Sequence, residues 1–290
     1  MGRKIYLNGK FVDRDKATVS VFDHGLLYGD GIFEGIRSYS RLVFKLREHI
    51  DRLYESARAI RLKIPMTKTA LKKAVVDTLK RNDLDDAYIR LVVTRGPGDL
   101  GLDPRKCTKG GVIFIIADRI ELYSEECYKK GLRIIAANTK KNHRSAIGPH
   151  IKSLNYLNNI LAKMDAIEKN VPEAIMLTHD DYVAECTGDN IFIVKTGRLF
   201  TPPRSLSLEG ITQDVVMQIA RRKKIPCKEK NMKLQEIYSA DECFLTGTAA
   251  EIAPVRKVDS HTIGNGKPGS ITCELLSEFR KQTKRNGVKY

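Results

Sequence analysis

Residues 87–95 read AYIRLVVTR, and this stretch decides the class of fold expected for the first half of the chain. Its β-branched and apolar residues are typical of a strand, and a second run of the same kind, GVIFIIADR, covers residues 111–119. Two amphipathic helical patterns precede them, EHIDRLYESARAIRL at 48–62 and TKTALKKAVVDTLKRNDL at 67–84. The combination predicts a compact unit in which helices pack on strands.

Further toward the N-terminus, residues 5–12 read IYLNGKFV. An Asn-Gly pair between alternating apolar residues predicts a β-hairpin, so the chain is expected to begin with antiparallel strands. The polar stretch RIELYSEECYKKG, which starts at Arg119, is expected to join two halves. We therefore predict an α/β (α+β) fold with a small N-terminal domain at 1–118, a linker at 119–128 and a larger C-terminal domain at 129–290.

The second half of the chain contains further helix and strand patterns. A strand starts at LRIIAANT, and a helix follows Lys152. The remaining elements are hairpin-like stretches at 173–185 and 190–203, a helix at 211–224, a strand at 241–247 and a terminal helix at 271–284.

Composition excludes several classes of protein. The longest apolar runs fall short of the roughly 18 residues that a membrane span requires, and the N-terminus lacks the pattern of a signal peptide. The six cysteines are scattered, without a CxxC pair or a histidine at metal-ligand spacing. We expect a cytoplasmic protein with no membrane partner and no metal site.

The formal net charge of +16 raises the possibility of a nucleic-acid partner. The basic residues, however, are dispersed along helical patterns and often stand beside acidic ones, without an aromatic-interleaved basic stripe. This distribution favours a solvated surface and no nucleic-acid partner.

The stretch GPGDLG at 96–101 matches the GxGxxG dinucleotide fingerprint and follows a predicted strand. In that fingerprint the glycine loop opens a helix whose N-terminus faces the pyrophosphate. Here LDPRKCTKGG follows, with Pro104 and two glycines, so a glycine-rich turn is predicted instead.

Four stretches in the second half are together consistent with a site for pyridoxal phosphate, which requires a lysine, donors for the phosphate and a group that tunes the ring nitrogen. Lys152 lies between Ile151 and Leu154, and apolar surroundings favour an uncharged, nucleophilic amine. A lysine whose stem packs while its head reaches water is the common alternative.

The remaining three stretches would hold the phosphate and the ring. Gly210 stands directly before a helical pattern, so free N–H groups there could bind a phosphate beside the Thr212 hydroxyl. FLTGTAAE at 244–251 offers a second small-residue turn. Glu185 falls between apolar strand-like runs, where a carboxylate requires a partner such as a protonated pyridine nitrogen. An ordinary helix start, a plain turn and a structural salt bridge remain the alternatives.

The stretches HIKSLNYLNNILAK, YVAECTGDNIF, LFTPP with LEGITQD, and FLTGTAAEIAPV resemble, in their order and spacing, the class IV (fold type IV) pyridoxal phosphate aminotransferases. SVFDHGLLYGDGIFEGIRSY and LREHIDRLYESA extend the resemblance over nearly the whole chain, and the branch it resembles most is that of the branched-chain amino acid aminotransferases. The resemblance implies two domains with the cofactor between them.

The resemblance also implies roles for individual residues. Lys152 would be the catalytic Schiff-base lysine, Glu185 the partner of the ring nitrogen and Tyr156 a neighbour of the ring's phenolic oxygen. The phosphate would be held by Arg52, Ile211, Thr212 and Thr248. The substrate would be contacted by Tyr28, Phe33, Tyr88 and Arg90, with the backbone of Thr248 and Ala249 receiving its α-carboxylate.

The implied activity is transfer of an amino group between leucine, isoleucine or valine and 2-oxoglutarate, with ping-pong kinetics. Arg90 and the TGTAAE turn resemble the branched-chain branch, whereas the loop at Gly96–Pro104 departs from its bacterial pattern. A D-amino acid aminotransferase on the same scaffold is the nearest alternative, and a basic nucleic-acid-binding protein is the alternative from another class. The expected partners are amino acids, 2-oxo acids and further copies of the chain, in at least a dimer with a hexamer as a larger alternative.

Overall fold

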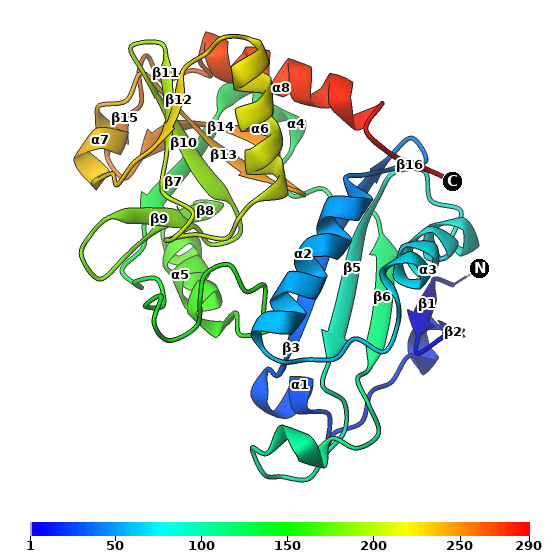
Figure 1. The fold of residues 1–290 in the computed structure, drawn as a ribbon. Coiled ribbons are helices and arrows are strands. Elements are labelled where there is room, and N and C mark those ends of the chain that lie inside the picture. The colour runs from blue at the N-terminus through cyan, green and yellow to red at the C-terminus, as the bar shows by residue number, and fades with distance from the viewer. Residues whose placement is uncertain (1) are drawn as a thin grey trace. The chain divides into compact units, whose positions relative to one another are not determined.

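The computed structural model describes residues 2–290, which form two compact units. The first unit contains the chain up to Ile120 together with Ile151–Asn155 and Thr283–Tyr290. The second unit contains Glu121–His150 and Tyr156–Gln282. Both units combine a β-sheet with helices, as Figure 1 shows for each of them.

These bounds differ from those expected from the sequence, which placed everything after residue 128 in the second domain. Helix α4 (Glu125–Lys130) begins inside the expected linker and includes its last four residues. Ile151–Asn155 belongs to the first unit because Ser153 forms a β-bridge with Ile32. The C-terminal residues belong there because strand β16 (Gly287–Lys289) pairs with strand β4 (Leu42–Phe44). Both segments join the first unit through backbone hydrogen bonds between residues that are distant in sequence, and local sequence patterns do not reveal such bonds.

The first unit is built on a seven-stranded sheet in the order β16-β4-β3-β5-β6-β1-β2, with every neighbouring pair antiparallel. Its other strands are β1 (Lys4–Leu7), β2 (Lys10–Asp13), β3 (Gly31–Tyr39), β5 (Ala87–Thr94) and β6 (Ile113–Asp118). Its helical segments are η1 (Arg14–Lys16), α1 (His24–Tyr28), α2 (Leu46–Ala59), α3 (Lys68–Arg81) and η2 (Pro104–Lys106).

The core of the first unit lies between this sheet and helices α2 and α3, which are seen against the strands in Figure 1. Alternate residues of β5 face the helices, and Ile89, Leu91 and Val93 are fully buried there. Each such side chain contributes roughly 1.5–3 kcal/mol when it is removed from water. Alternation leaves Tyr88, Arg90 and Val92 on the opposite face of the sheet.

The second unit is built on a mixed nine-stranded sheet in the order β12-β11-β10-β13-β14-β7-β8-β9, with β15 paired to β14. The pairs β11–β12, β14–β7 and β7–β8 are parallel. The strands are β7 (Leu132–Ala136), β8 (Glu173–Leu177), β9 (Val183–Cys186), β10 (Asn190–Lys195), β11 (Arg198–Thr201), β12 (Cys227–Glu229), β13 (Glu242–Gly247), β14 (Glu251–Val258) and β15 (His261–Thr262).

Helices pack on this sheet. They are α4, α5 (Leu157–Glu168), α6 (Ile211–Arg222), α7 (Leu234–Tyr238) and α8 (Ser270–Thr283), whose last residue belongs to the first unit. Helix α5 packs Ala162 and Ala166 against Ala174 and Met176 of β8. Within residues 2–290, no helix is both long and apolar enough to span a lipid bilayer.

The helices predicted at 48–62, 67–84, 211–224 and 271–284 are confirmed as α2, α3, α6 and α8. The predicted N-terminal hairpin is confirmed as β1 paired with β2. After Gly96–Gly101 the chain forms only the short 3₁₀ turn η2, as expected for a glycine-rich turn rather than a dinucleotide fingerprint.

Candidate active site

Lys152 is held by its main chain rather than by a helix. Its N–H donates to Ser56 Oγ at 3.1 Å, and its carbonyl accepts from the N–H of Phe33 at 3.0 Å. Leu154 N–H donates to the carbonyl of Gly31 at 2.9 Å. Residues 151–155 therefore run along the beginning of β3, and the Lys152 ammonium lies 4.6 Å from the centre of the Phe33 ring.

Phe33 and Arg90 lie on the same face of the sheet, and Phe33 links Lys152 to Arg90. The Arg90 guanidinium carbon lies 4.5 Å from the centre of the Phe33 ring, and Arg90 Nη2 donates to Tyr88 Oη at 3.3 Å. Such a cation on aromatic faces is attracted by the ring quadrupole. The structure thus brings together four of the predicted site residues, Lys152, Phe33, Tyr88 and Arg90, within the first unit.

Arg52, the predicted phosphate ligand in this unit, is oriented by a buried carboxylate. Its Nε and Nη2 each donate to Glu34 at 2.7 Å, in a bidentate pair. His49 Nδ1 lies 2.8 Å from Glu34 Oε2, and Glu34 is completely buried. Burial alone would raise the pKa of Glu34, but the Arg52 and His49 partners lower it to about 2. Burial also lowers the pKa of His49.

Tyr28 is tied to the loop at 96–103. Its hydroxyl donates to the carbonyl of Leu100, and its ring packs edge-on against His24. His24 Nε2 lies 2.9 Å from the carbonyl of Asp99. The structure therefore connects the loop that departs from the bacterial pattern to the helix that carries Tyr28.

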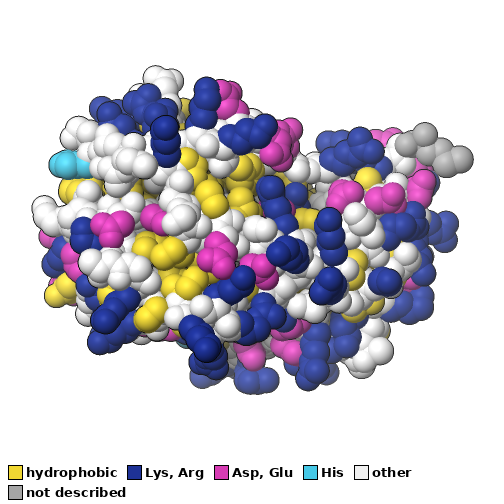
Figure 2. All heavy atoms as spheres, turned by 90° about the horizontal axis from the view of Figure 1, so that it is seen from above, with side chains coloured by type: hydrophobic (Ala, Val, Ile, Leu, Met, Phe, Trp, Pro, Cys, Tyr) yellow, Lys and Arg dark blue, Asp and Glu magenta, His cyan; other side chains and the backbone are white. Residues whose placement is uncertain are grey.

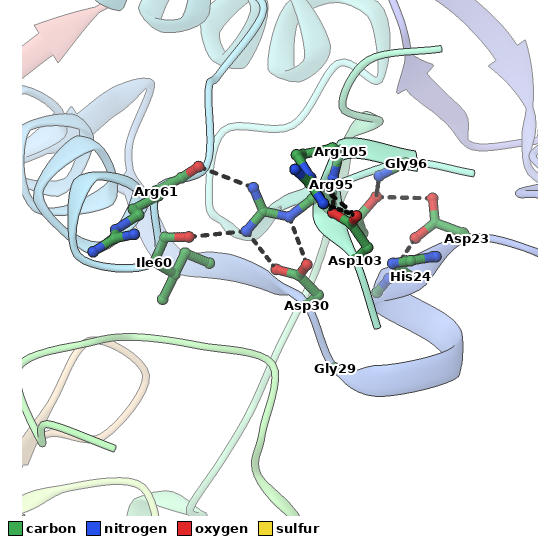
Figure 3. Close-up of polar contacts among 12 residues, drawn as sticks. Asp23, His24, Gly29, Asp30, Ile60, Arg61, Arg95, Gly96, Asp103 and Arg105 are labelled. Carbon is green, nitrogen blue, oxygen red and sulfur yellow. Dashed lines mark hydrogen bonds and ion pairs between the residues drawn. The ribbon is translucent and has the colours of Figure 1, made fainter. Parts of the chain in front are cut away.

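Arg95 anchors the start of this loop, as Figure 3 shows. Its guanidinium forms a bidentate pair with Asp30, with distances of 2.5 and 2.9 Å, and also donates to the carbonyls of Ile60 and Arg61 at 2.9 Å each. His24 N–H donates to the carbonyl of Gly96 at 3.0 Å. These bonds fasten the loop to the residues that follow α1 and α2.

In the second unit, Glu185 of β9 is held by two donors. Lys141 Nζ lies 2.5 Å from Glu185 Oε1, and the N–H of Leu208 donates to Oε2 at 3.1 Å. Burial lowers the pKa of Lys141, and the charge and hydrogen bond of Glu185 raise it by more, so that it lies above its ordinary value. Lys141, a residue of the same unit, therefore supplies part of the pairing that the Glu185 carboxylate requires.

Leu208 leads into helix α6, whose first turn has no side-chain cap. Asn190 Nδ2 donates to the carbonyl of Leu208 at 2.9 Å. A Cβ on Gly210 would lie 2.0 Å from Asn190 Oδ1, so only glycine allows this close approach. Among residues 2–290, the N–H groups of Ile211 and Thr212 have no hydrogen-bond partner, as expected at an open helix N-terminus.

The turn at 246–249 lies beside this helix start. Thr246 and Asn190 are cross-strand partners, so their side chains share one face of the sheet. The hydroxyls of Thr246 and Ser207 are buried, and within the described chain neither has a hydrogen-bond partner. A Cβ on Gly247 would lie 1.8 Å from Asp189 Oδ1. Burial, with the nearby charge of Glu173, raises the pKa of Asp189 to about 7.

These features of the second unit fit the phosphate and the ring of a pyridoxal cofactor. The open N-terminus of a 12-residue helix and two buried hydroxyls without partners can receive an anion. Glu185 retains acceptor capacity for a cationic nitrogen, because a carboxylate accepts about four hydrogen bonds. Within residues 2–290, no group of three histidine, cysteine or acidic side chains could hold a metal ion.

Comparison with known proteins identifies the family. Residues 31–258 match the family model of amino-transferase class IV. A protein of Methanocaldococcus jannaschii, whose assignment as a branched-chain-amino-acid aminotransferase is itself provisional, is 51% identical over 99% of this chain and 98% of its own length.

Solved structures agree with the family model. The branched-chain amino acid aminotransferase of Escherichia coli has a TM-score of 0.94 at 34% identity, covering 97% of this chain and 94% of that one. The branched-chain amino acid aminotransferase of Thermobaculum terrenum, solved in its pyridoxal phosphate form, has a TM-score of 0.87 at 29% identity, covering 97% and 94%.

The chain therefore belongs to the class IV aminotransferases. It is an aminotransferase of fold type IV whose cofactor is pyridoxal phosphate, as the motifs predicted.

Sequence reasoning missed three residues that the structure places beside the predicted ones. Lys141 pairs with Glu185, Asn190 supports the start of α6, and Asp189 packs against Gly247. Asp189 and Asn190 lie inside the motif YVAECTGDNIF. Two polar residues directly before a buried strand could have indicated a role in the site. Lys141 lies in a stretch of basic and polar residues, and nothing local distinguishes it from a surface lysine.

The buried Glu34–Arg52 pair predicts a pH-dependent loss of stability. Glu34→Gln leaves a buried arginine without its counter-charge and is expected to lower the free energy of unfolding by about 3–5 kcal/mol at pH 7. Because the folded-state pKa of Glu34 is depressed to about 2, the stabilisation is present above the ordinary value of 4.5 and is lost as pH falls toward 2. Urea unfolding at pH 7 and pH 3 measures the difference.

Asp51→Asn is the matched control for this measurement. Asp51 lies on the same helix as Arg52 but forms an exposed pair with Lys68 at 2.6 Å, so its loss should cost less than about 1 kcal/mol. Equal costs for the two variants would contradict the importance assigned to the buried pair.

Proposed function

We propose that this aminotransferase transfers amino groups between branched-chain L-amino acids and 2-oxoglutarate. The observation that carries the proposal is the Lys152–Phe33–Arg90 arrangement, in which one aromatic ring lies within 4.6 Å of the lysine ammonium and 4.5 Å of the arginine carbon. The site must accept an apolar side chain in one half-reaction and a second carboxylate in the other. An aromatic surface with an arginine beside it offers both.

Each proposed role is assigned to a side chain or a backbone group of this chain. The cofactor, when bound, supplies an aldehyde and an electron-withdrawing ring. Lys152 Nζ would carry the cofactor covalently and, once the substrate amine has displaced it, the freed amine would move the proton of the substrate α-carbon, so that this lysine acts as both anchor and base. Glu185 would accept from the ring nitrogen, and Tyr156 would lie beside the phenolic oxygen.

The remaining roles concern binding. The phosphate is received by Arg52, Ile211, Thr212 and Thr248, and the α-carboxylate by the backbone of Thr248 and Ala249. Tyr28, Phe33, Tyr88 and Arg90 contact the substrate side chain. Because a single lysine serves both half-reactions, donor and acceptor bind in turn and the kinetics are expected to be ping-pong.

Assays of turnover and binding distinguish the proposed function from two alternatives. Turnover of D-alanine with 2-oxoglutarate, without turnover of L-leucine, would make the protein a D-amino acid aminotransferase. Binding to nucleic acid that collapses with salt, without bound cofactor, would favour the basic nucleic-acid-binding alternative. Figure 2 argues against the latter, because the lysines and arginines on the face shown are scattered among acidic and uncharged side chains.

We also propose that the enzyme works in the cytoplasm. All six cysteines are free thiols, which is consistent with a reducing compartment.

We further propose that the chain forms at least a dimer. Helix α5 exposes an apolar stripe in the second unit, in which Leu157 is 67% and Ile167 61% exposed, with Ile160, Leu161 and Met164 between them. Contiguous apolar surfaces of this kind mark interaction sites. Ile160→Lys should shift the sedimentation coefficient toward the monomer, whereas the control Glu168→Lys on the same helix should not; unchanged assembly in both variants would remove α5 from the interface.

The assignment of Lys152 predicts a specific covalent label. The purified protein should be yellow, and borohydride reduction followed by peptide mapping should locate the cofactor on Lys152. Lys152→Ala removes both anchor and base and should abolish turnover. A label on another lysine would show that the assignment is wrong.

Arg90 is expected to discriminate between the two half-reactions. Arg90→Leu should harm the reaction of L-glutamate more than that of L-leucine, because only the dicarboxylate loses a charge-assisted hydrogen bond. The expected difference is about 1.5–3 kcal/mol, or roughly ten- to a hundredfold in kcat/KM. Single-turnover rates with the two amino acids measure it.

A suitable control is Arg81→Leu, because Arg81 also lies over an aromatic ring, that of Phe11 at 5.3 Å, but on helix α3. It should leave both rates near those of the wild type. Equal losses for both donors in Arg90→Leu would mean that Arg90 is structural or serves the α-carboxylate, and would reopen the D-amino acid alternative.

A further inference from the structure

We propose that Lys141 is a positioning residue for the aminotransfer reaction, whose ammonium pairs with the Glu185 carboxylate and orients it toward the cofactor's ring nitrogen. The inference rests on the proposed role of Glu185. The contact that motivates it is the ion pair between Lys141 Nζ and Glu185 Oε1 at 2.5 Å. Both residues belong to the second unit.

The pair is shielded from water at both ends. The Lys141 side chain is 15% exposed and that of Glu185 is 8% exposed. A carboxylate taken out of water without a counter-charge favours its neutral, protonated form. The Lys141 ammonium supplies such a counter-charge, in direct contact with the carboxylate that is proposed to face a cationic ring nitrogen.

Lys141 is also fixed in place by its main chain. Its N–H donates to the carbonyl of Leu177, at the end of β8, at 2.8 Å. The preceding carbonyl, that of Lys140, accepts from Asn158 Nδ2 of α5 at 2.9 Å. Glu185 pairs with Met176 on the neighbouring strand, so the backbone ladder of β8 and β9 sets the distance between the two charges.

Stability alone does not explain this arrangement. A buried ion pair contributes little net stability, because the desolvation of both charges offsets their attraction, and apolar residues of similar size often serve as well. Leu208 N–H donates to Glu185 Oε2, and Lys141 donates to Oε1. Each carboxylate oxygen therefore has one donor, and the group can still accept a hydrogen bond from a third donor. Tyr156, the proposed neighbour of the phenolic oxygen, also acts electrostatically on Lys141.

The test compares the full-length enzyme with the variants Lys141→Gln, Lys141→Arg, Glu185→Gln and the double variant Lys141→Gln/Glu185→Gln. Each is loaded with pyridoxal phosphate labelled with ¹⁵N in the ring, and the ¹⁵N chemical shift reports protonation of the ring nitrogen directly. Single-turnover rates with L-leucine, the cofactor dissociation constant and the melting temperature without cofactor are measured alongside. Lys140→Gln is the matched control, because Lys140 pairs with Asp181 at the surface.

Lys141→Gln should move the ring ¹⁵N shift toward the unprotonated value and slow single turnover by roughly ten- to a hundredfold, as Glu185→Gln does. Lys141→Arg, which keeps the charge, and Lys140→Gln should resemble the wild type. The double variant should be no slower than Glu185→Gln alone, because the lysine acts only through the glutamate.

Three results would overturn the inference: a wild-type ring shift in Lys141→Gln, an equal loss in Lys141→Arg, or a double variant slowed by the product of the single effects. If Lys141→Gln does not fold without cofactor, Lys141→Met tests the same loss of charge with apolar packing. Failure of the proposed function is distinguishable from these outcomes, because the wild type itself would then fail to turn over L-leucine or would carry the cofactor on a lysine other than Lys152, whereas the ring ¹⁵N shift does not depend on the amino donor.

Discussion

The alternation of side chains along β3 and β5 is the constraint on which the first unit depends. Successive residues of a strand point to opposite faces of its sheet, so Ile32, Glu34 and Ile36 face the helices while Phe33 faces away from them. On β5 the same rule sends Leu91 to the core and Arg90 to the other face. A slip of one residue in the pairing would exchange the core face with the face that carries Phe33 and Arg90.

Both units hold a buried carboxylate that is paired with a cation of its own unit. Glu34 receives the bidentate guanidinium of Arg52, and Glu185 receives the ammonium of Lys141. The two cations differ physically, since arginine offers a rigid fork and lysine a point charge. The first pair fixes the direction of a guanidinium that is proposed to bind phosphate, and the second holds a carboxylate that is proposed to bind a cation.

The position of Lys152 illustrates how a residue with a proposed catalytic role is placed without regular secondary structure. Residues 151–155 follow a stretch of the second unit along the chain, yet they bond to Gly31, Phe33 and Ser56 of the first. The backbone of Lys152 is thereby rigid, while its long side chain extends from a fixed point toward Phe33. A lysine with the proposed double role, anchoring a cofactor and moving a proton, benefits from a backbone that is fixed in place.

Much of the molecule could be predicted from local patterns, because these depend on the period of apolar residues and on turn chemistry. The helices α2, α3, α6 and α8, the Asn8–Gly9 hairpin and the family were all determined by the sequence itself. Only the tertiary structure decided that Ser153 and β16 join the first unit and that Lys141 meets Glu185. Strand pairing and the burial of a charge both depend on which distant residues come together, and neither the period nor the composition of a short stretch contains that information.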